Sequence, residues 1–241
     1  MLNWHNPQAY QFTNNLNAEQ WAWEFLRRNP QYRKEWREFS DTWKALEASY
    51  GKPGQRNIAA WKQDPRAWVP AAECTESDCR VDDEKVLIEC AMGARWGFYK
   101  FPPDSADDDP VGGGRLNWRD FPVEPALVHL EQVHSDVAPG SVMLSFDLSL
   151  PLRDQLTSAK RQLQIEQRNR VRAGVIRAPS IAAHREQLCR LLRLLDALEA
   201  EVKPEQIQSN LYAQTSAHYL EDRDEAILLR DLQYRRLLLL E

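Results

Sequence analysis

The sequence lacks the features that define several large classes of protein. No stretch approaches the ~18 consecutive apolar residues that a membrane-spanning helix needs. The first residues have no basic start followed by an apolar stretch, so no secretory signal is predicted. We therefore expect a cytoplasmic protein that does not engage a membrane. The four cysteines, Cys74, Cys79, Cys90 and Cys189, do not have zinc-ribbon spacing, and we expect them to be thiols in a reducing compartment.

Catalytic signatures are also missing. The chain has no nucleophile elbow, P-loop, dinucleotide fingerprint or paired-histidine zinc motif. His129 and His134, with Glu131 and Asp136 nearby, have a spacing that suits neither helix nor strand geometry for a metal site. Residues 107–109 are an acidic run of the kind that is usually just solvated. We expect no enzyme activity, no metal and no cofactor.

The chain does contain an uneven distribution of charge. Its formal net charge is −5, yet residues 63–150 carry 17 acidic and 7 basic side chains, whereas residues 151–180 carry 7 basic and 2 acidic ones, a balance of +5. A local basic surface attracts a phosphate backbone. Any DNA would therefore contact the ends of the chain and avoid the acidic middle.

Apolar periodicity predicts a helical N-terminal part. After a polar arm over residues 1–16, residues 18–29 are expected to be helical, with Asn29 and Pro30 closing that helix and opening the next. The second helix carries one aromatic and apolar stripe, at steps of three and four, that ends before Gly51. Its members are Tyr32, Trp36, Phe39, Trp43, Leu46 and Tyr50. A short helix is expected around Ile58 and Trp61.

The middle of the chain predicts a small antiparallel β region. Residues 85–90 and 94–101 are expected to form two strands joined by a turn near Met92 and Gly93. An exposed acidic loop at 102–114 follows, with further short strands near 125–130 and at 141–149.

The last third predicts helices throughout. Pro151 suits the start of a long helix, with a buried stripe of Leu152, Leu156, Ala159 and Leu163. A helix over 180–200, a short helix from Pro204, a loop near 214–220 and a final helix over 221–239 should follow. This order suits a trihelical helix-turn-helix. We expect an α+β protein with three domains: a helical one (1–72), a β-rich acidic one (73–150) and a helical DNA-binding one (151–241).

Two groups of cations are candidates for contact with DNA. The long helix and the residues after it supply Lys160, Arg161, Arg168, Arg170, Arg172 and Arg177, which could neutralise several phosphates. The final helix supplies Arg223, Arg230, Arg235 and Arg236. Arg223 and Arg230 are seven residues apart and share a face, and arginine pairs well with guanine edges. The alternative is that both groups form solvated helix faces, with salt bridges to Asp222, Glu225 and Asp231.

Three segments carry a resemblance to a known family. W-x-W-E-F-L-R-R-N-P-x-Y-R, at residues 21–33, resembles the transcriptional regulator-like domain found at the N-terminus of proteobacterial proteins. F-D-L-S-L-P-L-x-x-Q-L, at 146–156, and the tail Y-R-R-L-L-L, at 234–239, resemble the DNA-binding domain of RovC-like transcription factors. The resemblance implies sequence-specific binding to promoter DNA, activation of type VI secretion genes and a homo-oligomer, in particular a hexamer. RNA polymerase or another regulator would be a further partner.

Two other functions stay open at this point. A protein-interaction adaptor would use the same cations in salt bridges and would bind DNA weakly and without regard to sequence. An enzyme acting on nucleic acid would need a carboxylate cluster with bound metal, and no spacing in the sequence demands one.

Overall fold

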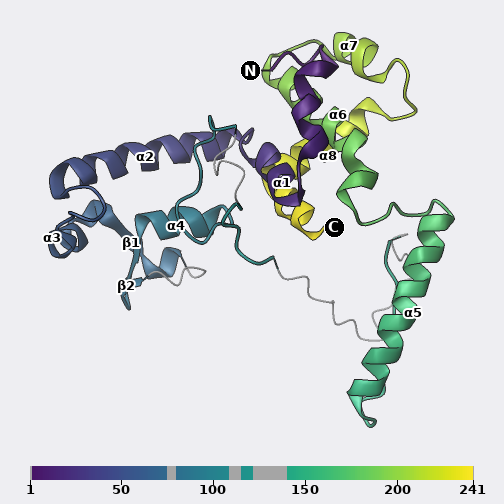
Figure 1. Cartoon of the computed structure of the whole chain (residues 1–241), viewed down its shortest axis with the longest axis horizontal. Helices are drawn as coiled ribbons and strands as arrows, with labels where there is room; N and C mark the ends of the chain where they lie inside the picture. The colour runs from purple at the N-terminus through teal and green to yellow at the C-terminus, as the bar shows by residue number, and fades with distance from the viewer. Residues whose placement is uncertain (1, 75–79, 109–114, 122–139, 241) are drawn as a thin grey trace. The chain divides into compact units, whose positions relative to one another are not determined.

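A computed structural model of the chain describes residues 2–74, 80–108, 115–121 and 140–240. It divides into two compact units, one formed by residues 1–121 and 185–241 and the other by residues 122–184. The expected α+β class is confirmed, because helices at both ends of the chain flank a small antiparallel sheet in its middle (Figure 1). The division into three domains stays a prediction.

The N-terminal helices begin where short polar side chains can cap them. The 3-10 helix η1 follows Asn6, the helix α1 follows Asn17 and the helix α2 follows Asn29, and each asparagine accepts hydrogen bonds from backbone N–H groups of the first turn. The bounds are η1 (Pro7–Asn15), α1 (Ala18–Leu26), α2 (Pro30–Tyr50) and α3 (Ile58–Gln63). The expectation of a polar arm over residues 1–16 is wrong, because η1 buries Tyr10 and Thr13.

The aromatic stripe of α2 lies where the sequence places it. Trp43 packs edge-on against Trp61 of α3 at 4.9 Å between ring centroids, and Leu46 is fully buried between the two helices. Arg56 lies over the Trp61 ring at 3.7 Å. Aromatic packing of this kind holds α3 against the end of α2.

The sheet is small and antiparallel. Its strands are β1 (Trp68–Pro70), β2 (Arg80–Asp82) and β3 (Lys85–Leu87), in the order β1-β3-β2, with Val69 opposite Val86. The 3-10 turns η2 (Pro65–Ala67) and η3 (Ala71–Glu73) flank β1. Directly after β3 the chain forms the helix α4 (Ile88–Arg95).

The prediction of two strands over 85–90 and 94–101 is therefore wrong beyond Leu87. Residues 88–95 are helical, and Gly93 lies inside that helix instead of in a turn. A Cβ at Gly93 would lie 2.7 Å from the Lys100 carbonyl oxygen, so the glycine allows the returning chain to pack on α4. Short apolar runs fit a buried helix as well as a strand, and the small side chains here favour close helix packing. Within residues 96–101, only Phe98 makes a β-bridge, to Trp118.

The C-terminal helices follow the expected order of long helix, short helix, loop and longer helix. Their bounds are α6 (Ile181–Glu199), α7 (Pro204–Ile207) with the π-helical turn η5 (Gln208–Tyr212), and α8 (Tyr219–Leu228). The helical path continues through the π turn η6 (Leu229–Gln233) and the 3-10 helix η7 (Tyr234–Leu239). η7 packs along α1 and buries Tyr234 and Leu237. The last segment of the chain is thus part of the core that surrounds α1.

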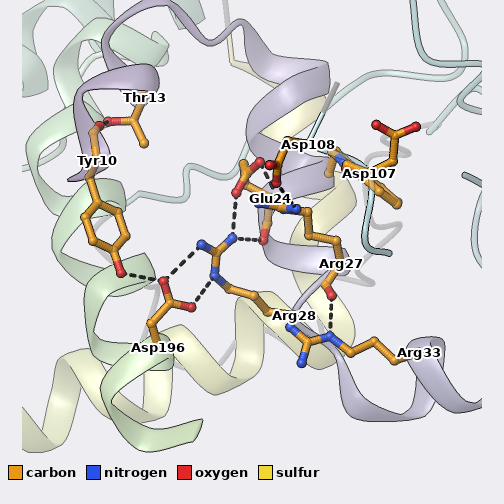
Figure 2. Close-up of polar contacts among 10 residues, drawn as sticks. Tyr10, Thr13, Glu24, Arg27, Arg28, Arg33, Asp107, Asp108 and Asp196 are labelled. Carbon is orange, nitrogen blue, oxygen red and sulfur yellow. Dashed lines mark hydrogen bonds and ion pairs between the residues drawn. The ribbon is translucent and has the colours of Figure 1, made fainter. Parts of the chain in front are cut away.

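A buried network of charges joins the N-terminal helices to α6 (Figure 2). The Arg28 guanidinium donates to Asp196 at 2.7 and 3.0 Å and to the Glu24 carboxylate at 2.6 Å, and all three side chains are at most 5% exposed. The Tyr10 hydroxyl donates to Asp196 at 2.5 Å. Buried charges are costly unless they are paired and hydrogen-bonded, so this network fixes how α1 and α6 pack.

Residues 101–108 run as a strap across α1 and α2. The Trp36 indole donates to the Pro102 carbonyl at 3.2 Å, the Tyr32 hydroxyl donates to the Pro103 carbonyl, and the Trp23 indole donates to the Asp107 carbonyl at 3.2 Å. Arg27 pairs with Asp108 at 2.6 Å. Most of these bonds go to backbone oxygens of the strap, so its path is fixed largely by aromatic residues elsewhere.

The second unit is dominated by the helix α5 (Leu152–Arg172). The expected strand at 141–149 is wrong, because residues 141–149 contain no strand and are exposed. A strand needs a neighbour to pair with, and no described segment pairs with this one. The expected strand near 125–130 lies outside the described residues, as do His129 and His134.

The stripe predicted to be buried on α5 is mostly exposed. Leu152, Leu156 and Leu163 are 46%, 56% and 38% exposed, and only Ala159 is buried. The periodicity correctly gave the side of the helix on which these residues lie. It could not show whether anything covers that side.

Candidate nucleic-acid interface

The helix α5 presents most of the cations that the sequence singles out. Lys160, Arg161, Arg168 and Arg172 are all exposed, and within the described residues none of their side chains forms an ion pair. Arg177, five residues beyond the end of the helix, is exposed as well. Exposed, unneutralised guanidinium and ammonium groups are the groups that contact phosphates.

Three of these cations lie on one side of the helix. Arg161, Arg168 and Arg172 follow one another at steps of seven and four, which places them in one row. Lys160 lies between that row and the leucine stripe, one turn from Leu156. The leucines of the apolar stripe lie on a different side of the helix. α5 therefore has a basic face and an apolar face, and both are exposed.

Arg153 lies on the same side of the helix as Lys160, although it was not among the predicted contacts. It is exposed and lies seven residues before Lys160. The seven-residue spacing was present in the sequence and could have identified it. Asp154, next to it, is an acidic residue in the first turn, where it complements the helix dipole.

Arg170 has a different environment from its neighbours. Its guanidinium pairs with Glu166 one turn earlier at 2.7 Å and donates to the Ser141 carbonyl at 2.9 Å. The side chain is 25% exposed. These bonds attach the segment before α5 to the end of the helix, so Arg170 has a structural role within the unit.

The two arginines expected to read bases form ion pairs with neighbouring acids. Arg223 pairs with Asp224 at 2.9 Å, and this hydrogen bond raises the pKa of the Arg223 guanidinium. Arg230 pairs with Asp231 at 2.7 Å and is 21% exposed. The expected salt bridge to Asp231 is present. Asp222 instead binds Arg190 at 2.6 Å.

The acidic content of α8 also matters for any contact with phosphates. Its ten residues include Glu221, Asp222, Asp224 and Glu225, against the single cation Arg223. Asp222 is buried, whereas the other three carboxylates are exposed. An exposed face with this balance repels a phosphate backbone.

Arg235 is used inside the fold. Its guanidinium donates to the backbone oxygens of Arg119 and Asp120 at 3.2 and 3.0 Å and lies over the Phe121 ring at 5.0 Å. Arg236 is exposed and donates to Gln233 at 2.9 Å. Of the four arginines in the final helical segment, Arg236 is exposed and the other three are partly buried.

Within the described residues, no group of three or more His, Cys, Asp or Glu side chains is arranged to hold a metal ion. None of the helices in those residues is both long enough and apolar enough to cross a membrane.

The comparisons with known proteins give one match. No curated protein and no solved structure matches the chain. The N-terminal segment of residues 3–68, which contains η1, α1, α2, α3 and η2, matches the model of a family. That family is described as the proteobacterial transcriptional regulator-like domain, and the match supports placing the chain among transcription regulators.

Proposed function

We propose that the protein is a DNA-binding transcriptional activator that holds the phosphate backbone with the basic face of α5. The observation that carries this proposal is the set of exposed cations on that helix without ion pairs in the described residues: the row of Arg161, Arg168 and Arg172, with Arg153 and Lys160 next to it. Each such cation that reaches a phosphate releases counterions. The matched regulator-like domain supports the same class of function.

The finer parts of the proposal rest on the resemblance to RovC-like factors. We propose that the protein acts in the cytoplasm, recognises specific promoter sequences, including those of type VI secretion genes, and performs no catalysis. RNA polymerase or another regulator is its proposed protein partner. Base reading is assigned to Arg223 and Arg230, which would have to exchange Asp224 and Asp231 for the edges of bases.

We propose further that the protein self-associates, in particular as a hexamer. The apolar face of α5 supports an intermolecular contact, because Leu152, Leu156 and Leu163 are exposed along one side of the helix. Exposed contiguous apolar surface of this kind usually marks a site of association. Light scattering measures the mass of the wild-type assembly and of the Leu156→Lys variant, which should be smaller if this face forms the contact. If both proteins have the same mass, the apolar face of α5 is not part of the interface between subunits.

The main test is a salt titration of DNA binding. Full-length protein is titrated with type VI secretion promoter fragments and with scrambled duplexes of equal length at two salt concentrations. The variant Arg161→Ala/Arg168→Ala/Arg172→Ala should lose affinity for both duplexes and reduce the slope of log K against log salt by about 2 to 3. A matched control, Lys44→Ala/Lys52→Ala/Lys62→Ala, removes three exposed cations from the other unit. If both variants lose the same affinity, α5 is not the contact.

Sequence discrimination is tested separately. Arg223→Ala/Arg230→Ala should reduce the preference for promoter over scrambled DNA while the salt slope stays near that of the wild type. A preference that survives this double substitution would refute the assignment of base reading.

A protein-interaction adaptor is the second candidate. The exposed apolar residues of α5 favour it. It predicts that the wild type binds promoter and scrambled duplexes equally weakly, and that the triple substitution on α5 leaves both affinities unchanged.

A further inference from the structure

A cavity of about 580 Å³ opens between α2, β1, η3 and α4. Proteins bind small molecules in clefts of about 300–1,000 Å³ that are mostly apolar and carry a few polar groups. The cavity lies wholly within the unit that contains the regulator-like domain and far along the chain from α5. Neither the proposed DNA contact nor the buried charge network uses it.

The apolar part of the cavity comes from two helices and a strand. Phe39 of α2, Val69 of β1, and Ile88, Ala91 and Met92 of α4 line it. Met92 is buried, and the other four side chains are partly exposed. Together they can cover a short aliphatic chain or one aromatic ring, and burying that apolar surface favours a complex.

The charged groups of the cavity favour a cation. Glu38 and Glu73 contribute two exposed carboxylates. Among the lining residues that the structure describes, the one cation is Arg95. It is already engaged, because its Nε and Nη2 donate to Glu35 at 2.5 and 2.7 Å. Lys34 approaches Glu38 only to 3.9 Å, and both side chains are more than 60% exposed, so that pair is weak.

We propose that this cavity binds a small organic ammonium ion, a primary amine attached to one aryl ring or to a short aliphatic chain. The apolar lining takes the carbon body, and the Glu38 and Glu73 carboxylates accept hydrogen bonds from the ammonium group. Charge-assisted hydrogen bonds are about twice as strong as neutral ones. A carboxylate ligand of the same shape meets two like charges and is rejected.

The test uses the full chain and three ligands of one shape. Phenethylamine, phenethyl alcohol and phenylacetate are titrated by calorimetry at neutral pH. The amine should bind most tightly, the alcohol about tenfold more weakly, and the acid not measurably. Equal affinity for the amine and the acid, or no heat from the amine at millimolar concentration, would overturn the proposal.

Two variants separate charge from shape. Glu38→Gln/Glu73→Gln keeps the volume and should weaken the amine about tenfold while leaving the alcohol unchanged. Ala91→Phe fills the apolar part and should abolish binding of both. The matched control, Glu205→Gln/Glu221→Gln, removes two exposed carboxylates outside the cavity and should bind like the wild type.

Thermal unfolding without ligand shows whether each variant is folded. If folded Ala91→Phe binds the amine as the wild type does, the amine is bound elsewhere and the proposal fails. DNA affinity is not part of this readout, so the cavity and the proposed DNA contact can fail independently.

Discussion

Arg28 is the residue on which the packing of α1 against α6 depends most directly. Its guanidinium is 5% exposed and lies between two buried carboxylates, Glu24 and Asp196. Hydrogen bonds and the charges of both carboxylates hold the pKa of Arg28 above its ordinary value, against the opposing effect of burial. Burial raises the pKa of the Tyr10 hydroxyl, and the hydrogen bond to Asp196 and the charge of Asp196 raise it further. The network is satisfied only while all its members are present.

Arg28→Met should destabilise the protein by about 3–5 kcal/mol, because it leaves the buried Asp196 carboxylate without its cation. Glu24 loses one of its two cations and keeps the pair with Arg27 at 3.1 Å. Urea unfolding followed by tryptophan fluorescence measures the loss. Adding Asp196→Leu to Arg28→Met should recover part of that loss, since the uncompensated charge of Asp196 is then gone. Asp196→Leu alone gives the cost of that substitution in the wild type. If it lowers the free energy of unfolding of Arg28→Met by the same amount, the two residues are not coupled.

Glu89 predicts a dependence of stability on pH. It is 8% exposed, its Oε2 has no hydrogen-bond partner, and burial raises its pKa although Arg56 and Lys100 lower it. A folded-state pKa above the unfolded value means that Glu89 favours folding below the unfolded pKa, and that this contribution is lost as pH rises through the folded pKa.

The variant Glu89→Gln removes the titrating group, and its melting temperature should exceed that of the wild type at pH 7. The difference should shrink as the pH falls toward 4, because the wild-type carboxyl then becomes neutral too. Differential scanning calorimetry over this range measures the difference. A constant offset at every pH would mean that the Glu89 carboxyl has no raised pKa.

At the scale of elements, Gly54 and Gly97 both stand at turns where the backbone has a positive φ. Gly97 has a φ of +81°, and a Cβ there would lie 2.6 Å from the Arg235 side chain. Gly54 has a similar φ of +91° but open space around it. A side chain at Gly54 would therefore meet backbone strain alone, whereas one at Gly97 would meet backbone strain and steric overlap.

Gly54→Ala should cost about 1 kcal/mol from the unfavourable φ alone. Gly97→Ala should cost roughly 1–2 kcal/mol more, because the Arg235 side chain must also shift. Chemical denaturation of both variants measures the difference. Equal costs at the two positions would mean that Arg235 does not constrain the turn.

The helices were predictable where the sequence contains both a cap and a long periodic stripe. Asn29, Pro30 and the aromatic stripe gave α2 its limits, and Gly51 ended it. α4 was missed because its eight residues are too few to separate a helical from a strand pattern. On α5 the cations were identified from the sequence, but the exposure of its leucines was not, because burial depends on what packs against a helix.

The partners of the final arginines were only partly predictable. The pair of Arg230 with Asp231 is between neighbours in sequence. Arg235, in contrast, binds backbone oxygens more than 100 residues away in the chain, and no local pattern could show this. Asp196 is visible in the sequence, because it is an acidic residue within the leucine-rich run of α6. A charge in such a run indicates a buried ionic partner.

At the scale of the whole molecule, the first unit is built from two separated stretches of chain, residues 1–121 and 185–241. The core around α1 needs both, since η7 packs on α1 and Asp196 of α6 neutralises Arg28. The segment that matches the regulator-like family, residues 3–68, therefore shares its core with the C-terminal helices.

A fragment of residues 1–121 should lack a cooperative thermal transition and bind a hydrophobic dye, because it exposes the surface of α1 that η7 covers. Adding a separate fragment of residues 185–241 should reduce dye binding. The intact chain is the control. A fragment 1–121 that melts as sharply as the intact chain would show that its core is complete without the C-terminal helices.

The ion pair between Arg28 and Asp196 joins residues 168 positions apart, which has a consequence for synthesis in the cell. At about 5–20 residues per second, the ribosome adds Asp196 roughly 10 to 30 seconds after Arg28. Throughout that interval Arg28 has its pair with Glu24 but not the one with Asp196, and the helical segment that covers α1 is also missing. Chaperones that bind exposed apolar segments thus have many seconds in which to bind this protein before its first unit can fold.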